Sequence, residues 1–166
     1  MRLNPILCAI ALVTAACAPL LAAADTPLAV GKPAPAFAVE SLTGKKISLA
    51  QFKGKPLYIN FFASWCGPCK LELPYIVKQY PAFKAKAVFL GVDELESPSQ
   101  VGPFAKQMGI PYAIAIDPGS VGAAYEIESL PKSIFIDKDG IVRAIWRGYI
   151  TPAIFKENMG LITSSR

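Results

Sequence analysis

The stretch Trp65-Cys66-Gly67-Pro68-Cys69 places two cysteines three positions apart. It follows an apolar run, 57–62, that predicts a buried strand, and it opens a segment compatible with a helix. A cysteine at the start of a helix has its thiolate stabilised by unpaired backbone N–H groups and by the positive end of the helix dipole. A second cysteine one turn later can close a short disulfide with it. The stretch therefore predicts a dithiol that carries out thiol–disulfide exchange.

The composition of the chain argues against a metal at this dithiol. The chain has four cysteines and no histidine, and Cys8 and Cys17 lie near its start. A structural zinc site needs four ligands, so Cys66 and Cys69 cannot form a closed one alone. A copper(I) site made of two thiolates stays open as an alternative, because soft thiolates favour that ion. We expect no metal, and no cofactor beyond the redox-active pair Cys66–Cys69.

The N-terminal segment, 1–24, has the pattern of an export signal. Arg2 precedes an uncharged apolar stretch, 6–18, and the alanines at 22–24 offer a small-residue cleavage site. Two alternatives stay open: a lipoprotein cleaved before Cys17, and an uncleaved N-terminal membrane anchor. All three place the folded part outside the cytoplasm, in the periplasm or on the extracytoplasmic face of a bacterial membrane.

The rest of the chain has the length and composition of one folded domain. The 166 residues are 53% hydrophobic and carry a net charge of +5, and the lysines are scattered rather than clustered. That pattern is typical of a solvated surface and not of a nucleic-acid-binding protein. We divide the chain into the signal or anchor, 1–24, an extended lead-in, 25–35, and the domain, 36–166.

Strand and helix patterns alternate along this domain. Two short strands around a turn at Gly44 precede the buried strand, and βα units follow it. The expected strands are 37–40, 46–49, 57–62, 87–92, 112–116, 133–137 and 141–148, and the expected helices are 67–83, 97–108, 121–125 and 151–162. This order predicts an α/β fold in which helices flank a central mixed sheet on both faces, with an added N-terminal β-hairpin.

Two motifs resemble those of the thioredoxin superfamily. The segment Phe61–Lys70, followed by Pro74, resembles the superfamily's active-site signature. The segment Ser129–Ser133 resembles the site where the superfamily keeps a proline in cis facing the disulfide, and that proline is Pro131 here. The lead-in, the segment 44–54 and Asn60 resemble the exported branch typified by the TlpA and ResA proteins. The domain 36–166 is thus identified as thioredoxin-like.

The resemblance implies roles for the residues around the dithiol. Cys66 would be the attacking nucleophile, with its pKa lowered from about 8.5 to roughly 6–7.5, and Cys69 the resolving thiol. Pro131 lacks an N–H, so a partner peptide would pair with the open backbone beside it as an added strand. The surface that meets the partner would comprise Trp65, Gly67, Pro68 and Leu130.

A proton-transfer group is also implied. Asn60 replaces the buried acid of thioredoxin, and an amide cannot give or take the proton of the second cysteine. The exported branch supplies a glutamate from the loop after the next strand. This correspondence points to Glu96 as the candidate proton relay, with Glu94 as the alternative.

The implied function is the reduction of disulfides in exported partner proteins, for example apocytochrome c. The resemblance also implies that this protein is a monomer and that a membrane thiol donor upstream reduces it. A peroxiredoxin-like peroxide reductase is one competing interpretation. The proline and threonine that such enzymes carry upstream of their cysteine are absent, because Ala63 and Ser64 precede Trp65 and no threonine lies between Gly44 and Cys66. The other competing interpretation is a copper-binding module that uses the cysteine pair.

Overall fold

The computed structural model of this chain describes residues 27–164. The expected signal or anchor, 1–24, lies outside the described residues, together with Cys8 and Cys17. Within 27–164, no helix has the length and apolar character needed to cross a bilayer. The first of these residues already belong to the fold, because Leu28 and Ala34 are buried in the core.

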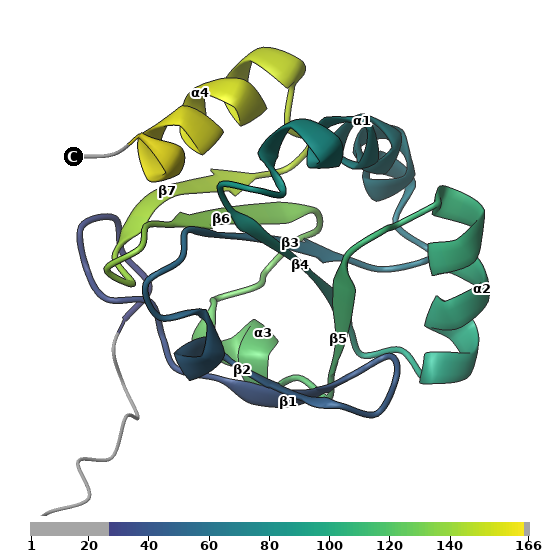
Figure 1. Cartoon of the computed structure of the whole chain (residues 1–166). Coiled ribbons are helices and arrows are strands. Elements are labelled where there is room, and N and C mark those ends of the chain that lie inside the picture. The colour runs from purple at the N-terminus through teal and green to yellow at the C-terminus, as the bar shows by residue number, and fades with distance from the viewer. Residues whose placement is uncertain (1–26, 165–166) are drawn as a thin grey trace, which may run out of the picture.

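One seven-stranded mixed sheet with helices on both faces forms the molecule, as the sequence predicts (Figure 1). The strand order is β2-β1-β5-β4-β3-β6-β7. The strands are β1 (Ala38–Ser41), β2 (Lys46–Ser48), β3 (Leu57–Phe62), β4 (Val88–Glu94), β5 (Ala113–Asp117), β6 (Lys132–Ile136) and β7 (Val142–Arg147). The helices are η1 (Leu49–Phe52), α1 (Gly67–Phe83), α2 (Pro98–Met108), α3 (Ser120–Ala124) and α4 (Pro152–Thr163).

The parallel centre of the sheet follows from buried βα units. β3 pairs in parallel with β4, and β4 with β5. All six residues of β3 are buried, which agrees with its nearly continuous apolar sequence. A capping box at Ser97 begins α2, and Gly109 in the left-handed conformation ends it. The antiparallel strands β6 and β7 then complete the side of the sheet beside β3.

The N-terminal hairpin is part of the main sheet rather than a separate layer before it. β1 pairs antiparallel with both β2 and β5, so it covers the edge that β5 would otherwise expose. The lead-in also differs from the expected extended arm. Gly31 N donates to Val142 O, Val142 N donates to Lys32 O, and Pro33 bridges to Ile141. The fold therefore starts before residue 36, because side chains of the lead-in, Leu28 and Ala34, are buried in the core.

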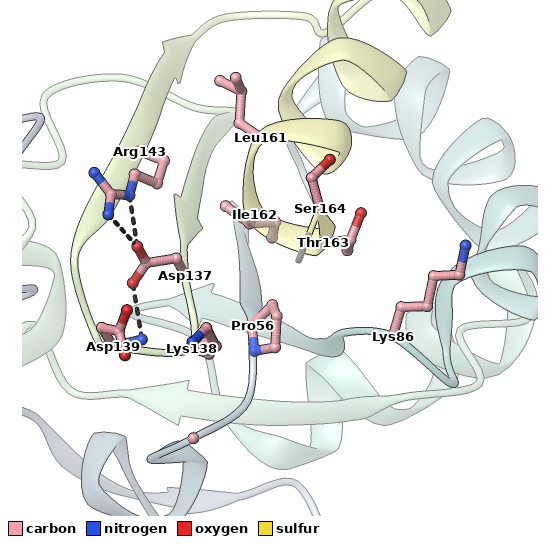
Figure 2. Close-up of a pocket in the computed structure, with 11 residues that line it drawn as sticks. Pro56, Lys86, Asp137, Lys138, Asp139, Arg143, Leu161, Ile162, Thr163 and Ser164 are labelled. Atoms are coloured by element: carbon pink, nitrogen blue, oxygen red, sulfur yellow. Dashed lines mark hydrogen bonds and ion pairs between the residues drawn. The ribbon is translucent and has the colours of Figure 1, made fainter. Parts of the chain in front are cut away.

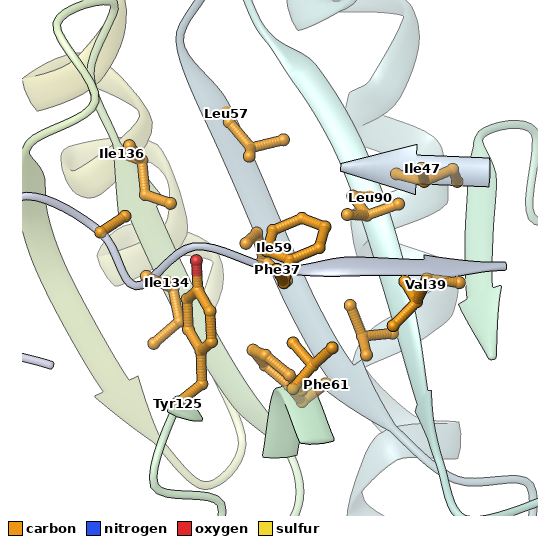
Figure 3. Packing of buried hydrophobic residues seen from close by; sticks show 14 of the residues in the cluster. Phe37, Val39, Ile47, Leu57, Ile59, Phe61, Leu90, Tyr125, Ile134 and Ile136 are labelled. Carbon is orange, nitrogen blue, oxygen red and sulfur yellow. The ribbon is translucent and has the colours of Figure 1, made fainter. Parts of the chain in front are cut away.

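Alternation along the strands divides the core between the two faces of the sheet. One face carries Ile59, Phe61 and Ile134 against Phe37 and Tyr125 (Figure 3). The other face packs against α1, α2 and α4, whose buried residues join Tyr58 and Phe62 of β3. Because α1 starts at the carboxyl end of β3, the dithiol lies at the edge of the sheet where open α/β folds usually bind ligands.

Candidate active site

Cys66 and Cys69 form a disulfide at the start of α1, with an S–S distance of 2.03 Å. Cys66 is the N-cap residue, and its Sγ accepts a hydrogen bond from Cys69 N at 3.2 Å. Pro68 stands in the first turn, where its missing N–H removes no helical hydrogen bond. The sulfur of Cys66 thus meets the N–H groups and positive dipole end of α1, which would stabilise its thiolate in the reduced protein.

The two sulfurs differ in accessibility. Cys69 is fully buried, whereas Cys66 retains 4% of its surface. Gly67 and Pro68 are exposed beside it, and Trp65 is 69% exposed. Of the two sulfurs, Cys66 is thus the more accessible one, next to the exposed Trp65. The nucleophilic role of Cys66, the resolving role of Cys69 and the partner-binding role of Trp65, Gly67 and Pro68 stay predictions.

The loop before β6 carries the expected cis proline. The peptide bond between Leu130 and Pro131 is cis, as predicted from the resemblance. Leu130 packs against the apolar cluster that contains both cysteines. These contacts bring the loop to the disulfide, although the two segments lie more than sixty positions apart in the sequence. The docking roles of Leu130 and Pro131 stay predictions.

A buried lysine follows the cis proline. Lys132 is 1% exposed, and its Nζ donates to Tyr125 O at 2.7 Å and to Glu126 O at 2.8 Å. Burial, followed by the charge of Arg147, holds the pKa of Lys132 below its ordinary value. The side chain ties the loop that ends in Pro131 to the end of α3. No pattern in the sequence indicates this burial, since a lysine is rarely buried without an acidic partner.

Glu72 is a buried acid that sequence analysis missed. It lies one turn after Cys69 on the buried face of α1 and has no exposed surface. Its carboxylate accepts hydrogen bonds from Asn60 Nδ2 at 2.9 Å and from Ile150 N at 2.8 Å. Burial raises the pKa of Glu72 to about 7, against the lowering effect of these two bonds. The available signal was its position three residues after Cys69, which places both on one side of a helix.

The two acids expected as proton relays lie in different surroundings. Glu96 reaches the active-site turn, where its carboxylate accepts hydrogen bonds from Ser64 N and Ser64 Oγ, each at 2.5 Å. Burial tends to raise its pKa, but the bonds from Ser64, the bond with Asp93 and the charge of Lys70 hold it below its ordinary value. Glu96 is therefore an anion at neutral pH, and its role as a relay stays a prediction.

Glu94, the alternative, faces the other side of the sheet. Its carboxylate lies against Gly122 of α3, where a Cβ atom would stand 2.5 Å from Oε2. Burial and the charge of Asp117 raise its pKa to about 7. Alternate residues of a strand point to opposite faces, so Glu94 projects away from the cysteine cluster. This orientation favours Glu96 over Glu94 at the dithiol.

A separate cavity of about 630 Å³ lies at the far end of β3 from the disulfide (Figure 2). Pro56, Lys86 and the end of α4 line it, together with an ion pair between Arg143 and Asp137. It holds none of the expected site residues. In residues 27–164, no group of three or more histidine, cysteine, aspartate or glutamate side chains is placed to hold a metal.

Comparison with known proteins points to one class. The model of the AhpC/TSA family matches residues 30–145. A thiol-disulfide oxidoreductase ResA of Bacillus thuringiensis subsp. konkukian is 40% identical over 136 residues, which cover 81% of this chain and 79% of that protein. The ResA of Bacillus subtilis is 36% identical over 134 residues, 80% of this chain and 75% of that protein.

Solved structures give the same picture. A thiol:disulfide interchange protein of the thioredoxin family from Chlorobium tepidum has a TM-score of 0.73 and 29% identity, over 82% of this chain and 99% of that one. The thioredoxin domain of a thiol-disulfide oxidoreductase from Bacteroides vulgatus has a TM-score of 0.72 and 26% identity, over 81% and 99% of the two chains. Both similarities extend over about four-fifths of this chain and nearly the whole of the other.

Proposed function

Because this chain belongs to the AhpC/TSA family and is a ResA-like thiol-disulfide oxidoreductase, we propose that it works as a reductant of disulfides in exported proteins. The observation that carries the proposal is the dithiol itself. Cys66 stands at the helix start with an N–H bond to its sulfur, and the fully buried Cys69 stands behind it. This arrangement fits attack by one sulfur and release by the other.

The proposed reaction has two exchange steps. The Cys66 thiolate attacks one sulfur of the partner disulfide, which forms a mixed disulfide and expels the other partner sulfur as a thiolate. Cys69 loses its proton and attacks Cys66 Sγ, which releases the second partner thiolate. The partner gains two electrons and takes up two protons, and the protein is left with the Cys66–Cys69 disulfide. A membrane thiol donor would then reduce that disulfide.

The proposed location is outside the cytoplasm, in the periplasm or on the outer face of a bacterial membrane. The export pattern of 1–24 supports it. Disulfides are rare in cytosolic proteins and common in exported ones, so the substrates of a disulfide reductant are more abundant outside the cytoplasm. Cysteines of apocytochrome c are one proposed substrate. The Gly67-Pro68 pair between the cysteines resembles that of reducing thioredoxins and supports this direction of electron flow.

We expect the Cys66–Cys69 couple to be strongly reducing. Equilibration of the protein with glutathione redox buffers, with the reduced fraction measured by thiol labelling and mass spectrometry, should give a potential below about −220 mV. Replacing Cys8 and Cys17 by alanine ensures that the labelled thiols are those of Cys66 and Cys69. A potential near about −120 mV would identify an oxidant and contradict the proposed direction of electron flow, but it would not contradict thiol–disulfide exchange itself.

Glu72 is the proposed proton acceptor for Cys69. Its buried carboxyl lies one turn from Cys69, and its pKa of about 7 suits a group that takes up a proton near neutral pH. As a base it acts when ionised, so the release of the partner should become faster as the pH rises through about 7.

Glu72→Gln should slow partner release by roughly tenfold to a hundredfold at neutral pH and remove that rise. The measurement is the decay of a preformed mixed disulfide with a fluorescent peptide, followed from pH 5.5 to 9. Glu157→Gln, which changes an exposed carboxyl of α4, is the control and should keep the wild-type profile. If Glu72→Gln kept the same rise through about pH 7, the proton acceptor would be another group.

A further inference from the structure

Asp93 is a buried carboxyl that the exchange mechanism does not use. It lies near the carboxyl end of β4, the central strand of the sheet, and has no exposed surface. Phe62 of β3 and Ile116 of β5 are its partners in the sheet. Oδ2 accepts a hydrogen bond from Glu96 N at 3.2 Å, and Oδ1 is buried without a partner in the described part of the chain. A buried carboxylate with so few donors is costly in its charged form.

A chain of hydrogen bonds joins Asp93 to the active-site turn. Asp93 binds the backbone of Glu96, and the Glu96 carboxylate binds both N and Oγ of Ser64. Ser64 lies inside the turn that Cys66 N closes by donating to Ala63 O at 3.1 Å. The position of the nucleophile thus depends on a turn whose outer side is held by Glu96. Asp93 and Glu96 come from β4 and its following loop, whereas the turn follows β3.

The loop between the two acids is held in an unfavourable conformation. Leu95 has φ of 64°, a left-handed value that residues other than glycine seldom adopt. Its N–H donates to Asp117 O at 3.1 Å, and its side chain is 72% exposed. Such strain persists only where neighbouring contacts fix it. Here the loop conformation is what brings the Glu96 carboxylate to Ser64.

Charge decides which acid carries the proton. Burial raises the pKa of Asp93 to about 8. The Glu96 carboxylate, through its hydrogen bond and its charge, and the charge of Glu94 act in the same direction, whereas the hydrogen bond from Glu96 N lowers this pKa. Lys70 of α1 acts on Glu96, which stays ionised. The partner positions on β3 and β5 are apolar, and Lys106 in the last turn is the charged residue of α2. The thiols of the reduced Cys66 and Cys69 lie in the same cluster as Phe62, and Asp117 pairs with Glu94, the neighbour of Asp93 on the opposite face. Asp93 is therefore neutral and Glu96 negative at neutral pH.

We propose that Asp93 is a positioning residue that acts as a neutral acid, with its proton held against the Glu96 carboxylate so that Glu96 fixes Ser64 and the turn that presents Cys66. When Asp93 loses this proton, two negative carboxylates face each other at the buried end of β4. Their repulsion displaces Glu96 from Ser64, and the nucleophile is presented less well. The proposal goes beyond the exchange reaction, which needs only the two cysteines and a proton acceptor.

Asp93→Asn tests this directly, because asparagine keeps the shape and a donor for Glu96 but does not titrate. The readout is the second-order rate of the reduced full chain, in the Cys8→Ala, Cys17→Ala background, with the aryl disulfide dithiobis(nitrobenzoate) from pH 6 to 9.5. The wild-type rate should rise as Cys66 ionises and fall again above pH 8. The variant should match it within about twofold at pH 6.5, reach a plateau, and exceed it at least about threefold at pH 9.5.

Glu94→Gln is the matched comparison, since it removes the neighbouring carboxyl of β4 on the opposite face and should keep the alkaline fall. An alkaline fall in Asp93→Asn equal to that of wild type would overturn the proposal. A second measurement covers the case in which the variant does not fold. The carboxyl carbon of Asp93 in the oxidised wild-type chain, followed by NMR, should titrate near pH 8, and an Asp93 already ionised at pH 6 would also overturn it.

Discussion

Cys66→Ser is expected to reduce disulfide exchange by at least about a thousandfold. A serine hydroxyl at the same helix start does not ionise near neutral pH, so no nucleophile remains at the exposed side of the site. Cys69 cannot replace it, because that sulfur is fully buried behind the first turn of α1. The measurement is the single-turnover reduction of a disulfide-bonded peptide by the reduced variant in the Cys8→Ala, Cys17→Ala background.

The variant should fold normally, because the serine oxygen can accept the same bond from Cys69 N. Circular dichroism and the thermal midpoint check this. A variant that kept a tenth of the wild-type rate would mean that Cys66 is not the nucleophile. Activity in cells that followed copper affinity rather than disulfide turnover across the cysteine variants would instead support the copper-binding interpretation. Fast peroxide consumption by the reduced wild type would support a peroxide reductase.

Cys69→Ser is expected to convert a short-lived mixed disulfide into a stable one. Cys66 can still attack, but no second thiol stands one turn inward to release the partner. The adduct should persist for minutes to hours instead of being resolved within seconds, since its breakdown then depends on an external thiol. The experiment expresses the variant with its own N-terminal segment, traps free thiols with an alkylating agent, and identifies adducts by mass spectrometry.

Cys66→Ser, Cys69→Ser is the matched control and should capture nothing. Adducts that appear equally in this double variant would come from Cys8 or Cys17 and would not report on the site. Adducts found only with Cys69→Ser should carry their bond on Cys66 and name the physiological partners. If Cys69→Ser formed no adduct while turning over like wild type, Cys69 would not be the resolving thiol.

Much of the fold was predictable because its signals are local. The bounds of β3 and α1 agree with the expected ranges, since a nearly continuous apolar run and the Gly-Pro dipeptide mark them directly. The pairing of β1 with β5 and the docking of Leu28 on the core were not predicted. The first depends on which strand edge of the sheet is left unpaired by the rest of the chain, and the second on which part of the core is left uncovered. No pattern within β1 or the lead-in indicates either.

The site was predictable to the extent that its chemistry is contained in short motifs. The cysteine pair was found from the local sequence, and the cis bond before Pro131 from the resemblance of 129–133 to a family motif. The titration behaviour of Glu72 and Asp93 was not, because burial sets it and burial is a property of the packed sheet. The same holds for Lys132, whose charge is stabilised by backbone carbonyls rather than by an acid that a sequence pattern could show.

The sequence by itself determined the reaction, since two thiols one helical turn apart can exchange disulfides wherever that helix is placed. The tertiary structure alone decided which groups surround those thiols and in which protonation state. Glu72 meets Asn60 and the backbone of Ile150, which is 78 positions away, and Glu96 meets Ser64 across 32 positions. Loss of water around these carboxyls changes their pKa values, and only the folded chain removes that water.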